Sequence, residues 1–225
     1  ILIINNGAYG ERFANIAKVY GISYTNLKFG LDKPINLERI VQELKEDKKL
    51  SHVAIVHHET TTGILNPIKE AGEIAKSFDC KYIVDAISSF AGIPFSVKDC
   101  KIDYMLSTSN KCIQGMPGIG FVICKKEELE KIKNYPKKSF YLDLYSQYES
   151  FEKNGQFQFT PPVQSVYALR QAIKEFFEEG AENHYERYKK NNRVLVKGMK
   201  ELGFEKIYDD ETEESGILTS FWEPK

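Results

Sequence analysis

The sequence predicts an α/β fold in which a mostly parallel sheet is flanked by helices. Short apolar runs, bounded by polar residues or glycine, alternate along the chain with segments of helical spacing. The runs are continuously apolar, which is typical of parallel strands that are buried on both faces. The 225 residues, 42% hydrophobic and 28% charged, suit one large globular domain plus part of another.

The first two thirds of the chain contain the clearest elements. Strands are expected at 1–4, 24–29, 52–56, 82–84, 104–106 and 120–124. Helices are expected at 11–20, 37–44 and 67–78. Asn36 is the expected N-cap of the second helix, and Pro67 suits the first turn of the third.

The character of the chain changes near Asn134. Residues 134–162 are rich in aromatic and polar residues, have weak periodicity, and predict no regular element. Two long helices are expected next, at about 162–179 and from Gly180 to about 202, followed by strand-like pieces near 207 and at 217–221. The predicted division is therefore a large domain over 1–162, and connecting helices with the start of a truncated smaller α/β domain over 163–225.

Charge and composition argue against several function classes. The formal net charge is −1, which gives no basic footprint for nucleic acid or an anionic membrane. No apolar run approaches the roughly 18 residues of a membrane span, so a cytoplasmic protein is expected. The four cysteines match neither zinc nor CxxC spacing and are expected to be reduced. His57 and His58 are adjacent and would point to opposite faces of a strand, so no metal site is expected.

Chemically useful side chains follow four of the expected strands. They are Tyr9, the run 59–63 (Glu-Thr-Thr-Thr-Gly), Asp85, and the run 107–111, which ends in Lys111. Ligands of open parallel sheets bind beyond the carboxyl ends of the strands, where these residues would meet. Pyridoxal phosphate (PLP) needs such a set, because a lysine binds its aldehyde and a carboxylate keeps its ring nitrogen protonated. Each residue alone is more often a surface or turn residue, but their joint order favours a PLP site.

Several stretches resemble the fold-type I, class V aminotransferases, and the resemblance covers essentially the whole chain. The most specific is Asn-Lys-Cys-Ile-Gln-Gly at 110–115, and the others are at 58–67, 84–90, 142–145 and 159–160. The resemblance implies a PLP-binding large domain and an aminotransferase activity.

The resemblance also implies a role for each matching residue. Lys111 would be the catalytic lysine that forms the Schiff base with PLP, and Asp85 would pair with the pyridine nitrogen. Tyr9 would stack on the cofactor ring, Thr60 would bind near the ring oxygen, and Asn110 would contact the phosphate.

Thr160 matches a family residue that reaches the cofactor phosphate of the partner subunit, which implies a homodimer. The family also has a Gly/Ser-rich phosphate loop upstream and an arginine in its C-terminal domain that binds the substrate anion. Neither motif lies between Ile1 and Lys225, so the segment alone is expected to bind PLP weakly and to be inactive.

The implied reaction is transamination of 2-aminoethylphosphonate with pyruvate, giving phosphonoacetaldehyde and L-alanine. Another class V transamination, such as that of alanine or serine with glyoxylate, stays open. Cysteine desulfuration is disfavoured, because Asn110 stands where desulfurases have histidine and no cysteine follows Cys124. A non-catalytic PLP-binding regulatory domain is a third possibility.

Overall fold

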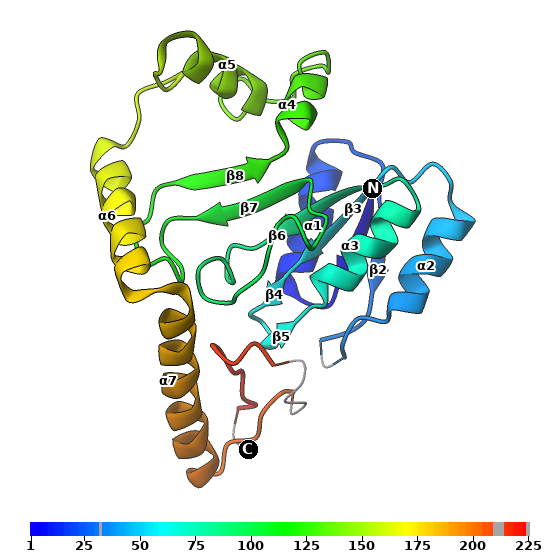
Figure 1. Ribbon diagram of the computed structural model, residues 1–225. Helices are drawn as coiled ribbons and strands as arrows, with labels where there is room; N and C mark the ends of the chain where they lie inside the picture. Colours follow the sequence, from blue (N-terminus) through cyan, green and yellow to red (C-terminus); the bar gives the residue numbers. More distant parts are fainter. Residues whose placement is uncertain (32, 209–213, 224–225) are drawn as a thin grey trace.

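The computed structural model describes residues 1–31, 33–208 and 214–223. Its main feature is a six-stranded sheet with the strand order β2-β1-β3-β6-β7-β8 (Figure 1). The strands are β1 (Leu2–Asn5), β2 (Thr25–Lys28), β3 (His52–Val56), β6 (Lys81–Asp85), β7 (Tyr104–Thr108) and β8 (Gly120–Cys124). The first five are parallel and β8 runs antiparallel to β7, which confirms the predicted mostly parallel sheet.

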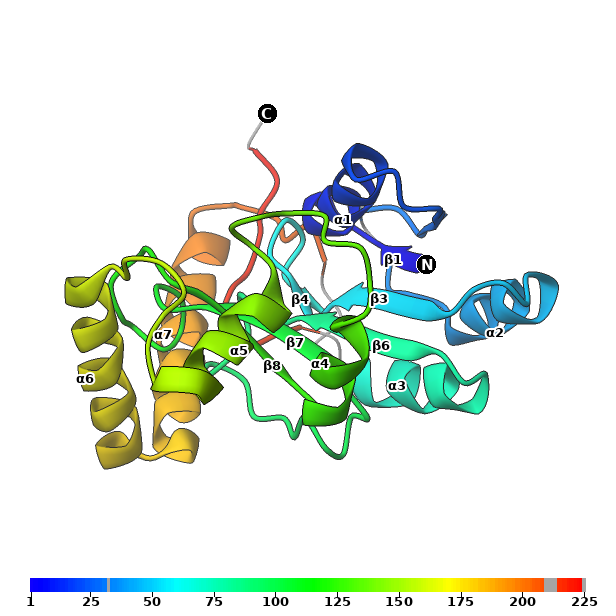
Figure 2. The same ribbon diagram turned by 90° about the horizontal axis from the view of Figure 1, so that it is seen from above.

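Helices cover both faces of the sheet. Figure 2 shows α1 on one side of the strands and α2 and α3 on the other. The helices are α1 (Ala8–Val19), α2 (Leu37–Glu46), α3 (Ile68–Ser77), α4 (Lys126–Ile132), α5 (Leu144–Asn154), α6 (Val163–Glu179) and α7 (Ala181–Glu201). Among the described residues, no helix has the length and apolar character that a membrane crossing requires.

Buried side chains on the two faces of the sheet form the core. In β1, Leu2 and Ile4 belong to the larger cluster, which contains residues of α2 and α3. Ile3 lies between them in sequence and packs with Ala14 and Ala17 of α1. This alternation explains why β1 is apolar at consecutive positions, because both of its faces are covered.

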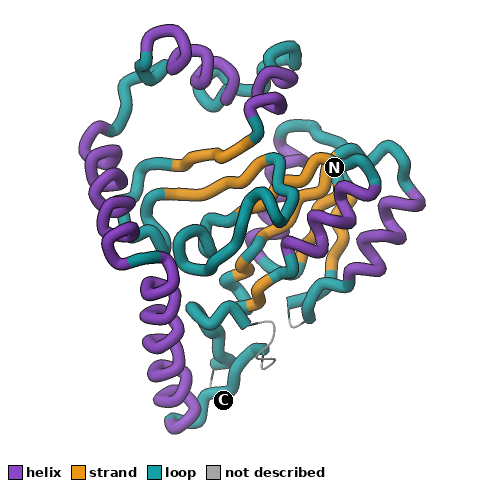
Figure 3. Tube along the Cα trace, viewed as in Figure 1, coloured by secondary structure: helices purple, strands orange, loops and turns teal. Residues whose placement is uncertain are grey.

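The structure differs from the sequence prediction in several places. α1 begins at Ala8 rather than Glu11, and α5 lies within the region where no element was predicted. A short hairpin, β4 (His58–Glu59) and β5 (Ile64–Leu65), follows β3. In place of the strands predicted near 207 and at 217–221, the structure has an antiparallel bridge between Lys206 and Phe221, and Figure 3 draws the described C-terminal segment as loop.

A buried carboxylate lies at the amino ends of β6 and β7. Asp103 receives hydrogen bonds from Lys76, from Lys125 Nζ at 2.8 Å and from the Tyr82 N–H at 2.7 Å. Burial acts to raise the pKa of Asp103, but these donors outweigh it and hold the pKa below its ordinary value. Asp103 is therefore charged and fully paired in the folded chain.

A second buried carboxylate lies on the neighbouring helix α4. Glu128 accepts hydrogen bonds from Lys81 Nζ at 2.8 Å and from Lys131 Nζ at 2.7 Å. Burial opposes ionisation here too, yet the two lysines hold the pKa of Glu128 below its ordinary value. The pair of carboxylates fastens α3 and α4 to the starts of β6 and β7.

Candidate active site

The carboxyl ends of β1, β3, β6 and β7 form one edge of the sheet, which we call the rim. The register pairs Val56 of β3 with Asp85 of β6, and Asp85 with Leu106 of β7. The polar residues predicted from the sequence follow these four neighbouring strands. The structure therefore places these five at one rim: Tyr9, Thr60, Asp85, Asn110 and Lys111.

The start of α1 is fastened to the rim by the buried side chain of Glu59. Glu59 Oε2 accepts the N–H groups of Tyr9 at 3.1 Å and Gly10 at 3.3 Å. Its other oxygen accepts the Thr61 N–H at 3.2 Å and the Thr61 hydroxyl at 2.5 Å. A carboxylate at this place satisfies helix N–H groups that have no partner within the helix and interacts favourably with the helix dipole. Glu59 thereby fixes the backbone that carries the ring of Tyr9.

Gly7 leaves the space that Glu59 occupies. A Cβ atom at Gly7 would lie 2.2 Å from Glu59 Cδ. We expect Gly7→Ala to lower the free energy of unfolding by about 1–3 kcal/mol, as overpacking does elsewhere. Urea unfolding of the complete, cofactor-free protein measures the change.

Gly198 provides the matched control for Gly7. It lies within α7, and a Cβ there would have no atom within 4 Å. Gly198→Ala should raise the free energy of unfolding by up to about 1 kcal/mol through helix propensity. Equal stability of Gly7→Ala and the unsubstituted protein would contradict the proposed contact with Glu59.

Asp85 ends β6 and is partly buried at the centre of the rim. Its Oδ1 accepts the Ile87 N–H at 2.8 Å, and no other hydrogen bond reaches its side chain from the described residues. Burial raises the pKa of Asp85, and the charge of Glu59 acts in the same direction. The Ile87 N–H and the Arg12 guanidinium oppose the shift only in part. A partly buried carboxylate with one hydrogen-bond donor binds a cationic N–H strongly, because the cation offsets the cost of keeping the negative charge out of water.

The β4–β5 hairpin carries Thr60 at its turn. The buried amides of Asn6 and Asn66 bond each other, with Nδ2–Oδ1 distances of 2.8 and 3.1 Å. They join the end of β1 to the end of the hairpin. From the C-terminal segment, the Ser220 hydroxyl donates to the Thr60 carbonyl at 3.3 Å. The position of Thr60 is therefore set by residues far away in the sequence.

Lys111 lies in the turn that follows β7, and its side chain is exposed. The Gln114 N–H donates to the Lys111 carbonyl at 2.8 Å, which closes the turn. Ser109 is buried, and its hydroxyl donates to the Met116 carbonyl at 2.5 Å. The Cys112 thiol contacts the Ser88 carbonyl at 3.6 Å, so the turn rests against the loop that follows Asp85. We call residues 109–115 the lysine turn.

The two adjacent histidines are buried at the start of the hairpin. His57 Nδ1 lies 2.8 Å from Ser89 Oγ, and His58 Nδ1 lies 3.2 Å from the Ser88 carbonyl. Burial lowers the pKa of His57 to about 3 and that of His58 to about 4, so both are neutral at physiological pH. In the part of the chain that the structure describes, no group of three or more potential metal ligands occurs.

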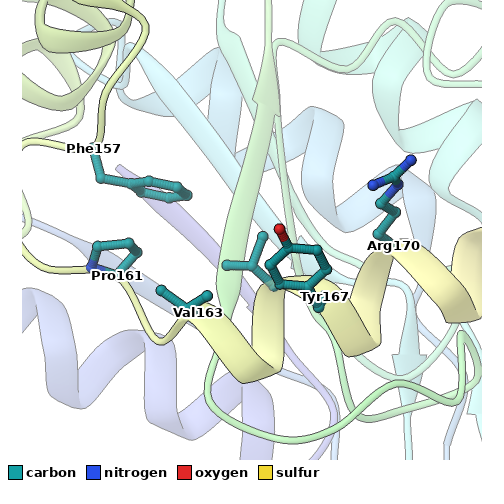
Figure 4. A pocket seen from close by; sticks show the side chains of 6 residues that line it. Phe157, Pro161, Val163, Tyr167 and Arg170 are labelled. Carbon is teal, nitrogen blue, oxygen red and sulfur yellow. The ribbon is translucent and has the colours of Figure 1, made fainter.

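Thr160 is the predicted site residue that the rim does not contain. It is exposed in the connection between α5 and α6, which Figure 1 shows well away from β4 and β5. A shallow pocket of about 310 Å³ lies beside it, lined by Phe157, Pro161, Val163, Val166, Tyr167 and Arg170. Figure 4 shows Phe157 and Tyr167 on opposite sides of this hollow.

Two residues that shape the site were not predicted from the sequence as site residues. Glu59 lies in the recognised run 59–63, but its role depends on the return of α1 to the same rim. His184 of α7 contacts the lysine turn across 72 residues of sequence. A lone histidine on a long polar helix gives no local signal of such a contact.

The fold and the rim define an α/β protein with a partly buried carboxylate at the end of β6 and an exposed amine in the turn after the neighbouring parallel strand β7. The chain belongs to the family of class-V aminotransferases, whose family model matches residues 1–223.

Individual relatives agree with this family. A 2-aminoethylphosphonate–pyruvate transaminase of Bacteroides fragilis is 46% identical over 100% of this chain and 62% of the relative. One of Lysinibacillus sphaericus is 47% identical over 100% of the chain and 61% of the relative. The crystal structure of a ureidoglycine–glyoxylate aminotransferase of Bacillus subtilis matches 99% of this chain and 58% of its own, with a TM-score of 0.88 and 29% identity. The chain thus spans about three fifths of the length of these relatives.

Proposed function

We propose that the protein containing this chain is a PLP-dependent aminotransferase that transfers the amino group of 2-aminoethylphosphonate to pyruvate. The products are phosphonoacetaldehyde and L-alanine. Family membership supports the reaction class, and the relatives at 46% and 47% identity, both named for these two substrates, support the choice of substrates. The alternative, transamination of alanine or serine with glyoxylate, has less support, because the ureidoglycine–glyoxylate aminotransferase of Bacillus subtilis is only 29% identical to this chain.

The placement of Lys111 and Asp85 at the same edge of the sheet carries the proposal. Asp85 ends β6, Lys111 follows the paired strand β7, and the lysine turn rests on the loop after Asp85. The donor set fits PLP, because an exposed amine suits its aldehyde and a partly buried carboxylate with a raised pKa suits its ring N–H. Tyr9 adds an aromatic ring at the same rim, with the Arg12 guanidinium 4.8 Å from the centre of that ring.

Each residue then has a definite task. When bound, PLP supplies the electron sink for the carbon that loses and regains a proton. Lys111 Nζ would hold the cofactor covalently and would move that proton as general base and acid. Asp85 would accept the ring N–H and keep that proton in place. Tyr9 would support the ring, while Thr60 and Asn110 would bind its ring oxygen and phosphate.

The substrates are tested with the complete protein and added PLP. L-Alanine formation from pyruvate is measured with 2-aminoethylphosphonate as donor, and glycine formation from glyoxylate is measured with alanine or serine. We expect kcat/KM to be at least about 100-fold higher for the phosphonate donor, because a site built for a charged group strongly rejects donors that lack it. Faster turnover with glyoxylate would reassign the substrates, and cofactor binding without turnover by any pair would favour a regulatory role.

A homodimer with shared sites is part of the proposal. Thr160 stands on an exposed segment, and its neighbours Phe157, Val163 and Tyr167 are 45%, 47% and 66% exposed. An apolar surface around a pocket is typical of a contact with another protein surface. We propose that this segment packs on a second copy and that Thr160 reaches the partner's cofactor phosphate.

Mixing two inactive variants tests the shared site. Lys111→Ala removes the amine, and Thr160→Asp places a negative charge against the phosphate. Refolded together in equal amounts, they should regain about a quarter of the wild-type activity, because half of the dimers are mixed and each has one intact site of two. An active monomer in light scattering, or a mixture that stays inactive, would refute the shared site.

A further inference from the structure

A buried histidine lies directly behind the lysine turn. His184 lies in the first turn of α7, and its side chain is 2% exposed. Its Nε2 lies 2.9 Å from the carbonyl oxygen of Cys112. A carbonyl oxygen only accepts hydrogen bonds, so Nε2 carries a proton and donates it. Figure 1 shows the start of α7 reaching the loop that follows β7.

The ring of His184 is held at its other nitrogen by Glu179 at the end of α6. Glu179 Oε2 lies 2.5 Å from His184 Nδ1, and the same carboxylate receives Arg187 Nε at 2.5 Å and Nη2 at 2.8 Å. The hydrogen bonds from Arg187, with the one from His184, lower the pKa of Glu179 to about 2. The carboxylate therefore stays charged over the whole physiological range of pH. Arg187 Nη2 and His184 Nδ1 lie 3.1 Å apart because both groups bind the same carboxylate.

Packing fixes the plane of the imidazole. The ring of Phe176 lies 5.1 Å from that of His184 in an edge-to-face arrangement, and the ring of Tyr188 lies 5.2 Å away. Tyr188 also binds the lysine turn, because its hydroxyl accepts Gln114 Nε2 at 3.1 Å. Two consecutive turns of α7 thus hold the half of the turn that follows Lys111.

Cys112, the residue directly after Lys111, is closely packed. Its Sγ would lie 2.5 Å from a Cβ at Gly92, so the loop after β6 packs closely on one side. His184 holds the backbone of the same residue through the Cys112 carbonyl. The residue next to Lys111 is therefore clamped, while the Lys111 side chain itself is exposed.

We propose that His184 is a positioning residue, which holds the backbone at Cys112 and thereby sets the place from which Lys111 Nζ acts on the cofactor and the substrate carbon. The inference rests on the proposed function of Lys111 and adds to it a residue that does not touch the reacting atoms. Displacement of a reacting group by about 1 Å costs on the order of 100-fold in rate. Loss of the His184 hydrogen bond should consequently lower kcat far more than it changes KM.

Three variants of the complete protein separate positioning from stability. His184→Ala removes the donor, and His184→Gln can still donate from an amide nitrogen at nearly the same reach. Ile40→Val deletes a buried methylene group from the core at α2, away from the lysine turn, and so lowers stability alone. The readouts are hydrogen exchange of residues 109–115 in the cofactor-free protein, and kcat and KM with saturating PLP.

We expect His184→Ala to speed exchange of the lysine turn at least about 10-fold and to lower kcat at least about 10-fold, with KM changed less than about threefold. His184→Gln should restore most of both, and Ile40→Val should lower thermal stability with exchange of the turn and kcat near wild type. Equal effects of His184→Ala and Ile40→Val on exchange and kcat, or no rescue by glutamine, would overturn the positioning role. A borohydride label on a lysine other than Lys111 in the wild type would instead overturn the proposed function, and the exchange result would still report on the clamp.

Discussion

Replacing Lys111 by alanine is expected to lower transamination by the complete protein at least about 10³-fold, because both the covalent anchor and the proton-transferring base are lost. Lys111→Arg should be equally inactive, since a guanidinium keeps the charge but is neither a nucleophile nor a base at neutral pH. Borohydride treatment followed by peptide mapping should place the pyridoxyl group on Lys111 in the wild type and leave both variants unlabelled.

Lys98 offers a matched control for this experiment. Like Lys111, it is an exposed lysine outside the strands and helices, and it lies in the loop between β6 and β7. Lys98→Ala should keep the activity and the label. Near-normal turnover by Lys111→Ala, or a label that persists in it, would show that another amine holds the cofactor.

Asp85→Asn should have opposite effects on activity and stability. Turnover should fall at least about 100-fold, because an amide cannot hold the proton on the cofactor ring nitrogen. The cofactor-free protein should become more stable at neutral pH. Burial raises the pKa of Asp85 above its ordinary 3.8, so the charged carboxylate is disfavoured in the folded state.

The pH dependence gives the sign of this stability effect. A carboxylate whose folded pKa is raised costs nothing below its unfolded pKa, and the cost grows as pH rises from there through the folded pKa. The advantage of Asp85→Asn in urea unfolding should therefore be present at pH 7 and vanish below about pH 3.8, the ordinary pKa. Asp99→Asn, at an exposed position, serves as the control substitution. A wild type that is more stable than Asp85→Asn at pH 7 without cofactor would contradict this account.

The sequence was sufficient to predict the sheet and the rim because both depend on local patterns. Continuous apolar runs mark strands that are buried on both faces, and polar residues directly after them must reach the carboxyl edge. Asn36 was predicted as a cap and does accept the Arg39 N–H at 2.9 Å. Tyr9 was placed at the rim, although α1 begins one residue before it rather than two residues after it.

The remaining features depend on contacts between distant residues. The hairpin strands β4 and β5 have two residues each, too few to show an alternating pattern. α5 has only Leu144 as an apolar residue besides its three aromatic ones, so its helical periodicity is weak, although Asp143 caps it and Gly155 ends it in a left-handed conformation. The contact of Glu59 with α1, and that of His184 with the lysine turn, join elements 49 and 72 residues apart. No periodicity in a sequence can reveal such pairs.

The carboxylates Asp103 and Glu128 bind lysines at the amino ends of β6 and β7. The candidate site lies at the opposite, carboxyl ends of these strands. β7 begins next to Asp103 and ends before the lysine turn, and its five residues span about 16 Å. Substitutions at that separation usually have additive effects on stability. In relatives adapted to different temperatures or salt concentrations, substitutions of the lysines at the amino end can therefore change the free energy of unfolding in small steps. The candidate site at the opposite end would keep its own contacts, so the stability of the fold can be altered without touching that site.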